Sequence, residues 1–114
     1  MTKIKIYRNS HALIVGFELS GHTGYGEAGQ DVLCASLSAI AQSVALGLKD
    51  VLNIDIEIVR KDNDGYMLVE LPKDIDSKLL EKAQVLLDTM LISFEDLVDG
   101  YSHYISMEVI ENVY

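Results

Sequence analysis

Cys34 is the residue of this chain whose type and position are best suited to chemistry. It is the single cysteine among 114 residues, and it stands three positions after Asp31 at the start of a segment with helical periodicity. Backbone N–H groups in the first turn of a helix have no partner within the helix and carry the positive end of its dipole. A thiolate is favoured there, and the same N–H groups could stabilise an oxyanion. Cys34 is therefore our candidate nucleophile, although a lone cysteine on a helix is more often a small buried residue.

His22 is the candidate partner of this thiol. It precedes Cys34 by twelve residues, and the segment between them is rich in glycine. A span of this length can fold back, so that the imidazole could take the thiol proton and later protonate a leaving amine. A cysteine and a histidine are the minimal set for acyl transfer by a thiol. The spacing alone does not bring the two side chains together, and a histidine after a loop glycine is usually a surface residue.

Asp31 and Ser38 are candidates for supporting roles. Asp31 stands where a helix N-cap belongs, which stabilises a helix by about 1 kcal/mol, and it could also orient His22. Ser38 follows Cys34 by one helical turn on the same face. Its hydroxyl could bond back to the helix carbonyls, or it could contact Asp31 or a substrate. The three histidines have no ligand spacing, so we expect no metal site.

Residues 21–30 are predicted to form a mobile loop that carries function, because four glycines disfavour both strand and helix. These glycines are Gly21, Gly24, Gly26 and Gly29. Residues 24–29 match the dinucleotide pattern G-x-G-x-x-G, but the segment follows a hairpin strand instead of opening a parallel βαβ unit. No Lys or Arg occurs between residues 21 and 48, and Glu27 and Asp31 would repel a pyrophosphate. We therefore do not expect a nucleotide cofactor, or any other.

The elements that must position these residues follow from hydrophobic periodicity. We predict strands over 2–8 and 12–20, a helix over 31–49, strands over 54–60 and 66–71, a helix over 77–98 and a strand over 103–110. A hairpin turn with Gly65 at positive φ joins the third and fourth strands, and Gly100 can end the second helix. The order ββαββαβ predicts an α+β fold, a two-layer sandwich of a mostly antiparallel five-stranded sheet with two helices on one face. Residues 1–114 are expected to form a single domain.

Charge and composition limit the class of partner and the compartment. Lys plus Arg number 9 against 18 Asp plus Glu, a formal charge of −9, which disfavours nucleic acid and favours a basic protein partner. One cysteine excludes an internal disulfide and fits a reducing cytoplasm. The alternating N-terminus has no apolar signal-peptide region, and no run of about 18–20 uninterrupted apolar residues indicates a membrane helix. We expect a cytoplasmic protein that does not associate with membranes.

The glycine-rich segment and the helix start together resemble the Prp family of ribosomal-processing cysteine proteases. The family pattern is G-H, a spacer containing glycine, then G-x-D, two hydrophobic residues, C-A-x, a hydrophobic residue and S. Its fixed positions are all present, as Gly21-His22 and then Gly29-Gln30-Asp31-Val32-Leu33-Cys34-Ala35-Ser36-Leu37-Ser38. The segment Tyr101-Ser102-His103-Tyr104-Ile105 is similar to the family's aromatic C-terminal strand, with Ser102 where many members have proline.

This resemblance implies an activity and assigns roles to residues. Members remove a short N-terminal extension from a large-subunit ribosomal protein, so a basic ribosomal protein would be the substrate. Cys34 would be the nucleophile and His22 the general base and then the acid, with Asp31 and Ser38 supporting the site. The resemblance also implies a homodimer and a loop between His22 and Cys34 that closes over bound peptide.

Three other functions stay open on the residues alone. A non-enzymatic acidic adaptor for ribosome assembly would bind a basic ribosomal protein without cleaving it. A redox or thiol-transfer protein would need an external thiol, because the chain has no second cysteine. A hydrolase of small thioesters or amides would use the same Cys34 and His22.

Overall fold

The seven main elements follow one another in the predicted order ββαββαβ. The computed structural model describes residues 1–27 and 29–113. Its elements are β1 (Thr2–Arg8), β2 (Ile14–Ser20), α1 (Val32–Leu46), β3 (Glu57–Lys61), β4 (Tyr66–Glu70), α2 (Ser77–Gly100) and β5 (Ile105–Ile110). A π-helical segment, η1 (Gly47–Val51), continues α1, and a 3-10 turn, η2 (Asp62–Asp64), joins β3 to β4.

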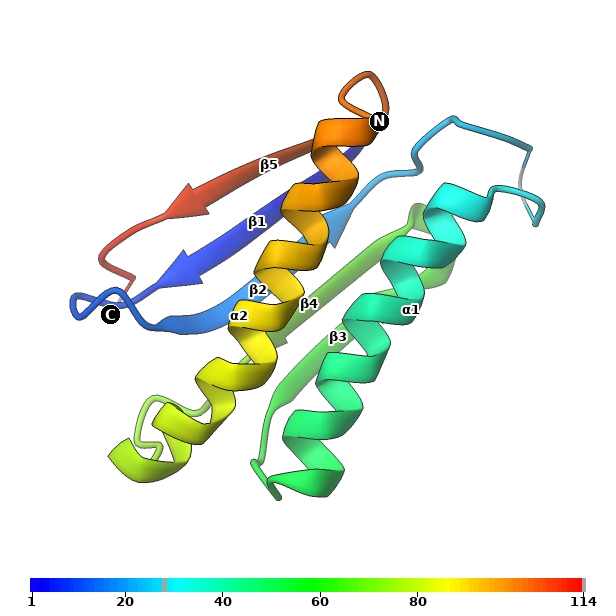
Figure 1. Ribbon diagram of the computed structural model, residues 1–114. Coiled ribbons are helices and arrows are strands. Elements are labelled where there is room, and N and C mark those ends of the chain that lie inside the picture. The colour runs from blue at the N-terminus through cyan, green and yellow to red at the C-terminus, as the bar shows by residue number, and fades with distance from the viewer. Residues whose placement is uncertain (28, 114) are drawn as a thin grey trace.

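The five strands form one sheet in the order β3-β4-β2-β1-β5. Three of the four neighbouring pairs are antiparallel, and only β1 and β5 run parallel. Both helices lie on the same face of this sheet (Figure 1). The prediction of a mostly antiparallel five-stranded sheet with two helices on one face is confirmed.

The hydrophobic core fills the space between the helices and the sheet. The sheet contributes alternate residues such as Ile4, Ile6 and Phe17, and each helix contributes one stripe. The stripe of α1 and η1 consists of Leu33, Leu37, Ala41, Ala45 and Leu48, and that of α2 includes Ala83, Leu87, Met90, Leu91 and Phe94. Because Leu33 and Leu37 are fixed in this core, Cys34 is turned toward one side of α1 and not into the interior.

The starts of β2 and β3 differ from those predicted. β2 starts at Ile14 instead of residue 12, because Ala12 has a left-handed φ of 61° in a turn that the Asn9 side chain holds through the N–H groups of His11 and Leu13. β3 starts at Glu57 instead of residue 54, and all five of its residues are exposed. Ile54, which contributes to the apolar alternation that predicted a strand from residue 54, is buried beside η1 and does not join the sheet. Its N–H donates to the Leu48 carbonyl.

The end of α2 also differs from the prediction. Gly100 is the last helical residue and not a left-handed cap, and Tyr101 closes the helix through its N–H. His103, which was predicted to lie in the last strand, lies in the turn before β5. This turn places Tyr101 and Tyr104 beside the N-terminal part of the chain, because the Thr2 N–H donates to the Tyr104 carbonyl.

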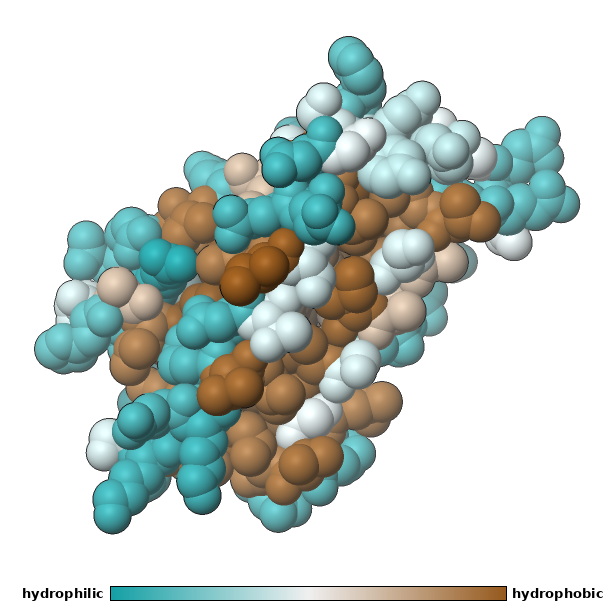
Figure 2. Space-filling model, in the orientation of Figure 1, coloured by the Kyte–Doolittle hydropathy of each residue, from teal (hydrophilic) through white to brown (hydrophobic). Residues whose placement is uncertain are grey.

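The continuous helix Val32–Val51 is long and apolar enough to cross a membrane by length and composition alone, with a mean hydropathy of 1.5. Its buried stripe belongs to the core that the helices share with the sheet, and α1 packs against α2. At Gly47 the two helices approach closely, since a Cβ there would lie 3.0 Å from a methyl carbon of Leu86. Apolar side chains nevertheless remain on the outer face of the helix layer (Figure 2).

Candidate active site

The start of α1 is held by Asp31, as predicted. Asp31 has extended backbone angles, φ −81° and ψ 101°, and its Oδ1 accepts the N–H of Cys34 at 2.9 Å. This is the N-cap arrangement, in which the side chain satisfies a first-turn N–H that has no intrahelical partner. Cys34 is the third residue of α1, and its backbone N–H donates its hydrogen bond to Asp31.

The second carboxylate oxygen of Asp31 connects the helix start to residues 21–30, which we call the glycine loop. Its Oδ2 accepts the Thr23 hydroxyl at 2.6 Å and the Gly26 N–H at 3.2 Å. Burial alone would raise the pKa of Asp31, but the hydrogen bonds from Thr23, Cys34 and Gly26 outweigh it and lower the pKa to about 2. Asp31 is thus ionised at neutral pH, and it ties the loop to the helix.

The sulfur of Cys34 is half-buried and contacts one loop residue through two hydrogen bonds. The Thr23 N–H donates to Sγ at 3.3 Å, and the thiol donates to the Thr23 hydroxyl oxygen at 3.4 Å. The alternative of a cysteine sealed in the core is therefore wrong. Sequence reasoning missed Thr23, because nothing in the glycine-rich segment indicated that this one residue would be buried.

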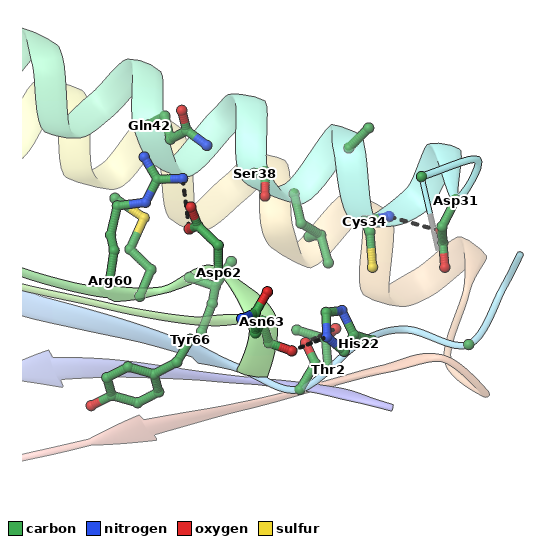
Figure 3. Close-up of a pocket in the computed structure, with 18 of the residues that line it drawn as sticks. Thr2, His22, Asp31, Cys34, Ser38, Gln42, Arg60, Asp62, Asn63 and Tyr66 are labelled. Carbon is green, nitrogen blue, oxygen red and sulfur yellow. Dashed lines mark hydrogen bonds and ion pairs between the residues drawn. The ribbon is translucent and has the colours of Figure 1, made fainter. Parts of the chain in front are cut away.

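His22 lies across from Cys34 and is held by a residue that is distant in the sequence. Its Nε2 lies 3.2 Å from the backbone carbonyl of Asn63 in η2 (Figure 3). A carbonyl can only accept, so Nε2 carries the hydrogen, and in the neutral ring Nδ1 then holds the lone pair that a general base needs. Within residues 1–27 and 29–113, no hydrogen bond joins His22 to Cys34 or to Asp31.

The β3–β4 hairpin forms the opposite wall of the site, which sequence reasoning did not predict. Gly65 has the predicted positive φ, 62°. A Cβ at Gly65 would lie 2.7 Å from the Gly21 carbonyl oxygen and 3.0 Å from Cε1 of His22. The hairpin backbone therefore packs directly against the histidine, and Gly65 is needed for this close approach as well as for the turn.

A cavity of about 740 Å³ lies between the hairpin and α1. His22, Asp31 and Cys34 line its one end, and Ser38, Gln42 and Arg60 line the other, where Arg60 pairs with Asp62 at 3.0 Å. Figure 3 shows these side chains arranged along the two walls of the cavity. Ser38 faces the cavity one turn beyond Cys34, but its hydroxyl bonds neither to Asp31 nor to the helix carbonyls in the described structure.

The glycine loop has several contacts of its own. Gly21, Gly24 and Gly29 have positive φ angles of 88°, 73° and 83°. The Gly21 carbonyl accepts the Thr2 hydroxyl at 3.1 Å. Tyr25 packs edge-on against Tyr101 and Tyr104, with ring centroids 5.5 and 5.2 Å apart. The loop is therefore attached both to the start of α1 and to the corner between α2 and β5.

The geometry brings together the groups that a thiol hydrolase needs. No group of three His, Cys, Asp or Glu residues suited to a metal ion occurs in the described part of the chain. What the structure brings together is a sulfur at a helix start, an imidazole with a free Nδ1 and an open cavity beside both. These are the groups that nucleophilic acyl transfer requires.

Comparison with known proteins agrees with this chemistry. The family model of the cysteine protease Prp matches residues 1–106. The ribosomal processing cysteine protease Prp of Bacillus subtilis is 31% identical over an alignment of 107 residues, and the match covers 89% of this chain and 90% of that protein.

Two crystal structures of the essential ribosomal processing protease Prp of Staphylococcus aureus share the fold. The complex with a covalently linked product peptide has a TM-score of 0.84 at 24% identity, and the match covers 96% of this chain and 99% of that one. The complex with a substrate peptide has a TM-score of 0.80 at 23% identity, with the same coverage. At these identities the likeness shows a common fold.

Proposed function

Since the chain belongs to the Prp family of cysteine proteases, we propose that it removes an N-terminal extension from a large-subunit ribosomal protein. The observation that carries this proposal is the position of Cys34, whose half-buried sulfur lines the cavity at the start of α1 and faces the glycine loop. The Bacillus subtilis relative is a ribosomal processing cysteine protease, which supports a ribosomal substrate. The formal charge of −9 supports it, because ribosomal proteins are basic.

In the proposed reaction His22 Nδ1 takes the proton of the Cys34 thiol, and the sulfur attacks the scissile carbonyl carbon. The tetrahedral intermediate collapses to a thioester on Cys34, and the imidazolium gives its proton to the leaving amine. Water, deprotonated by the same imidazole, then hydrolyses the thioester and restores the thiol. In the structure the Asn63 carbonyl accepts the hydrogen on Nε2, which leaves Nδ1 as the atom that exchanges protons.

The oxyanion needs donors other than the N–H of Cys34, because that group donates to Asp31. Val32 and Leu33 supply the other first-turn N–H groups, which have no intrahelical acceptor. A movement of the glycine loop brings His22 to the sulfur, since the two residues line one cavity without a hydrogen bond between them in the described structure. We expect this movement to accompany the binding of a peptide in that cavity, because closure over a substrate also excludes water.

Cleavage of a synthetic peptide tests the assignment. The peptide spans the extension and the first mature residues of the ribosomal protein, and mass spectrometry follows the two products. We expect one cut with the native protein and none with Cys34→Ala. Tight binding without any cut would favour the adaptor, and full activity in both Cys34→Ser and Cys34→Ala would overturn the nucleophile.

We also propose that the protein is a homodimer that pairs through the outer face of the helix layer. Val85 and Ile92 are 69% and 67% exposed and lie seven residues apart, on one face of α2. Exposed apolar residues that gather on one face mark interaction surfaces. Sedimentation equilibrium should show a dimer that Val85→Glu with Ile92→Glu dissociates, while Val109→Glu, an exposed valine of β5, leaves it intact.

A further inference from the structure

Thr23 is buried in the middle of an exposed loop. Its side chain and backbone are 2% exposed, whereas His22 and Gly24 on either side are exposed. Burial of a hydroxyl is unfavourable unless hydrogen bonds replace the lost water. The Thr23 hydroxyl takes part in three hydrogen bonds and the Thr23 backbone N–H makes a fourth. Three of the four involve Cys34 or Asp31. A residue in this position acts on the sulfur and on the helix cap together.

The direction of the hydrogen bonds follows from the number of hydrogens available. A threonine hydroxyl has one hydrogen, and an ionised carboxylate can only accept. The short contact of 2.6 Å between the hydroxyl oxygen and Asp31 Oδ2 therefore uses that hydrogen. Toward Cys34, at 3.4 Å, the hydroxyl oxygen presents lone pairs, and only a protonated sulfur can donate to them.

Thr23 thus has opposite effects on the two forms of the sulfur. Its backbone N–H, 3.3 Å from Sγ, favours the thiolate. Its hydroxyl oxygen favours the thiol, because lone pairs and a thiolate repel each other. The second effect depends on Asp31, since a hydroxyl released from Asp31 could turn and donate to the sulfur.

We propose that Thr23 is a positioning residue for Cys34, holding it as a thiol in the chain S–H···O–H···carboxylate that ends on Asp31. This inference rests on the proposed function and extends it, because it names the contact that His22 must replace when it takes the proton. The proton passes from Cys34 to His22 and not to Asp31, whose bonds to Thr23, Cys34 and Gly26 stay in place. Thr23 also fixes the direction of the sulfur, which keeps the nucleophile aimed into the cavity.

The charged and titratable groups that face Cys34 come from three elements. They are Asp31 at the start of α1 and His22 on the glycine loop, with Arg60, Asp62 and Tyr66 lining the same cavity from the hairpin. Removal of the Thr23 hydroxyl takes one hydrogen bond from Asp31, but Asp31 keeps the N–H groups of Cys34 and Gly26, which still lower its pKa, so it stays ionised across pH 5 to 10. A change in the pH dependence of the sulfur in a Thr23 variant therefore reports on the hydroxyl itself.

Alkylation of Cys34 by iodoacetamide across pH 5 to 10 tests the proposal. The chain has one cysteine, so the added mass reports on this sulfur alone. Thr23→Val keeps the shape and the backbone N–H and removes the hydroxyl, and Thr23→Ser keeps the hydroxyl as the matched control. We expect Thr23→Val to move the midpoint of the rate profile to lower pH and to raise the rate below the midpoint by about fivefold, the factor for one hydrogen bond. Thr23→Ser should follow the native profile.

Two outcomes would overturn the proposal. An unchanged midpoint in Thr23→Val would leave Thr23 with a structural role only. A shift to higher pH would mean that the hydroxyl donates to the thiolate. Circular dichroism checks the fold, and Thr23→Ala replaces Thr23→Val if the valine variant does not fold. The alkylation needs no peptide, so a protein that failed to cleave its substrate could still show the shift, which separates this inference from the proposed function.

Discussion

Both helices of this protein begin at an aspartate, and of the two aspartates only Asp31 lines the cavity. Asp76 caps α2 with one oxygen, which accepts the N–H groups of Lys78 and Leu79 at 3.1 and 3.3 Å. Asp31 caps α1 with one oxygen and uses the other to hold Thr23 and Gly26. The local capping chemistry is therefore shared, and the difference lies in what precedes each helix.

The third residue of each helix shows what this difference does. Leu79 packs against the core, as expected for a helix whose start only supports the fold. Cys34 faces the cavity, and the glycine loop turns back over it from residue 21 onward. The segment before α2 is instead a short turn in which the Ile75 N–H donates to the Pro72 carbonyl. In this protein, the helix start that lines the cavity is the one over which the preceding loop turns back.

The largest expected effect is the difference in activity between substitutions of Cys34 and of Leu79, the third residues of α1 and α2. Cys34→Ala should lower kcat/KM for peptide cleavage by about 10³-fold or more, because no other group can form the thioester, while the free energy of unfolding stays nearly unchanged. Leu79→Ala should cost about 2 kcal/mol of stability through lost packing and leave kcat/KM unchanged. Peptide kinetics and urea unfolding measure both. The comparison fails if Leu79→Ala impairs cleavage as strongly as Cys34→Ala.

A smaller loss of activity should follow from a substitution that displaces the His22 ring. In Gly65→Ala the new Cβ would meet the Gly21 carbonyl and the His22 ring, at a φ that disfavours alanine. We expect kcat/KM to fall by about tenfold to a hundredfold as the imidazole is displaced. Gly100→Ala at the end of α2 is the matched control, because no atom lies within 4 Å of its Cβ position. It should keep full activity and gain up to about 1 kcal/mol of stability.

The two caps can be compared directly. Asp76→Ala should lose about 1 kcal/mol of stability, the usual value for an N-cap, and Asp31→Ala should lose more, because two further donors lose their acceptor. Only Asp31→Ala should also lower kcat/KM, by about tenfold, because Thr23 and Gly26 lose their acceptor. Thermal unfolding and peptide kinetics on the same samples distinguish the two effects. Equal activity in both variants would mean that the second oxygen of Asp31 serves only the fold.

The effect with the smallest consequence for activity is a pH dependence of stability. The pKa of Asp31 is about 2 in the folded protein, whereas an aspartate in an unfolded chain titrates near about 3.9. Between about pH 4 and pH 2 the unfolded state therefore binds a proton that the folded state does not, and the free energy of unfolding falls as the pH falls. Urea unfolding across this range should show a shallower fall in Asp31→Asn. An identical slope in both proteins would contradict the lowered pKa.

Sequence reasoning recovered what depends on short separations along the chain. The cap at Asp31 and the position of Cys34 follow from a spacing of three residues, and the turn at Gly65 follows from its flanking strands. The held tautomer of His22 could not be predicted, because its partner Asn63 is 41 residues away and uses a backbone carbonyl that carries no residue signature. The burial of Thr23 depends in the same way on how the loop folds over α1.

The contact of Tyr25 with Tyr101 and Tyr104 gives the loop an optical signal of its own. The chain has six tyrosines and no tryptophan, so its near-ultraviolet circular dichroism arises largely from tyrosine rings in fixed surroundings. Three of the six meet in this one cluster. Movement of the loop away from the α2–β5 corner would therefore change the spectrum of the native protein without any label, and the motion could be timed while the sulfur remains free to react.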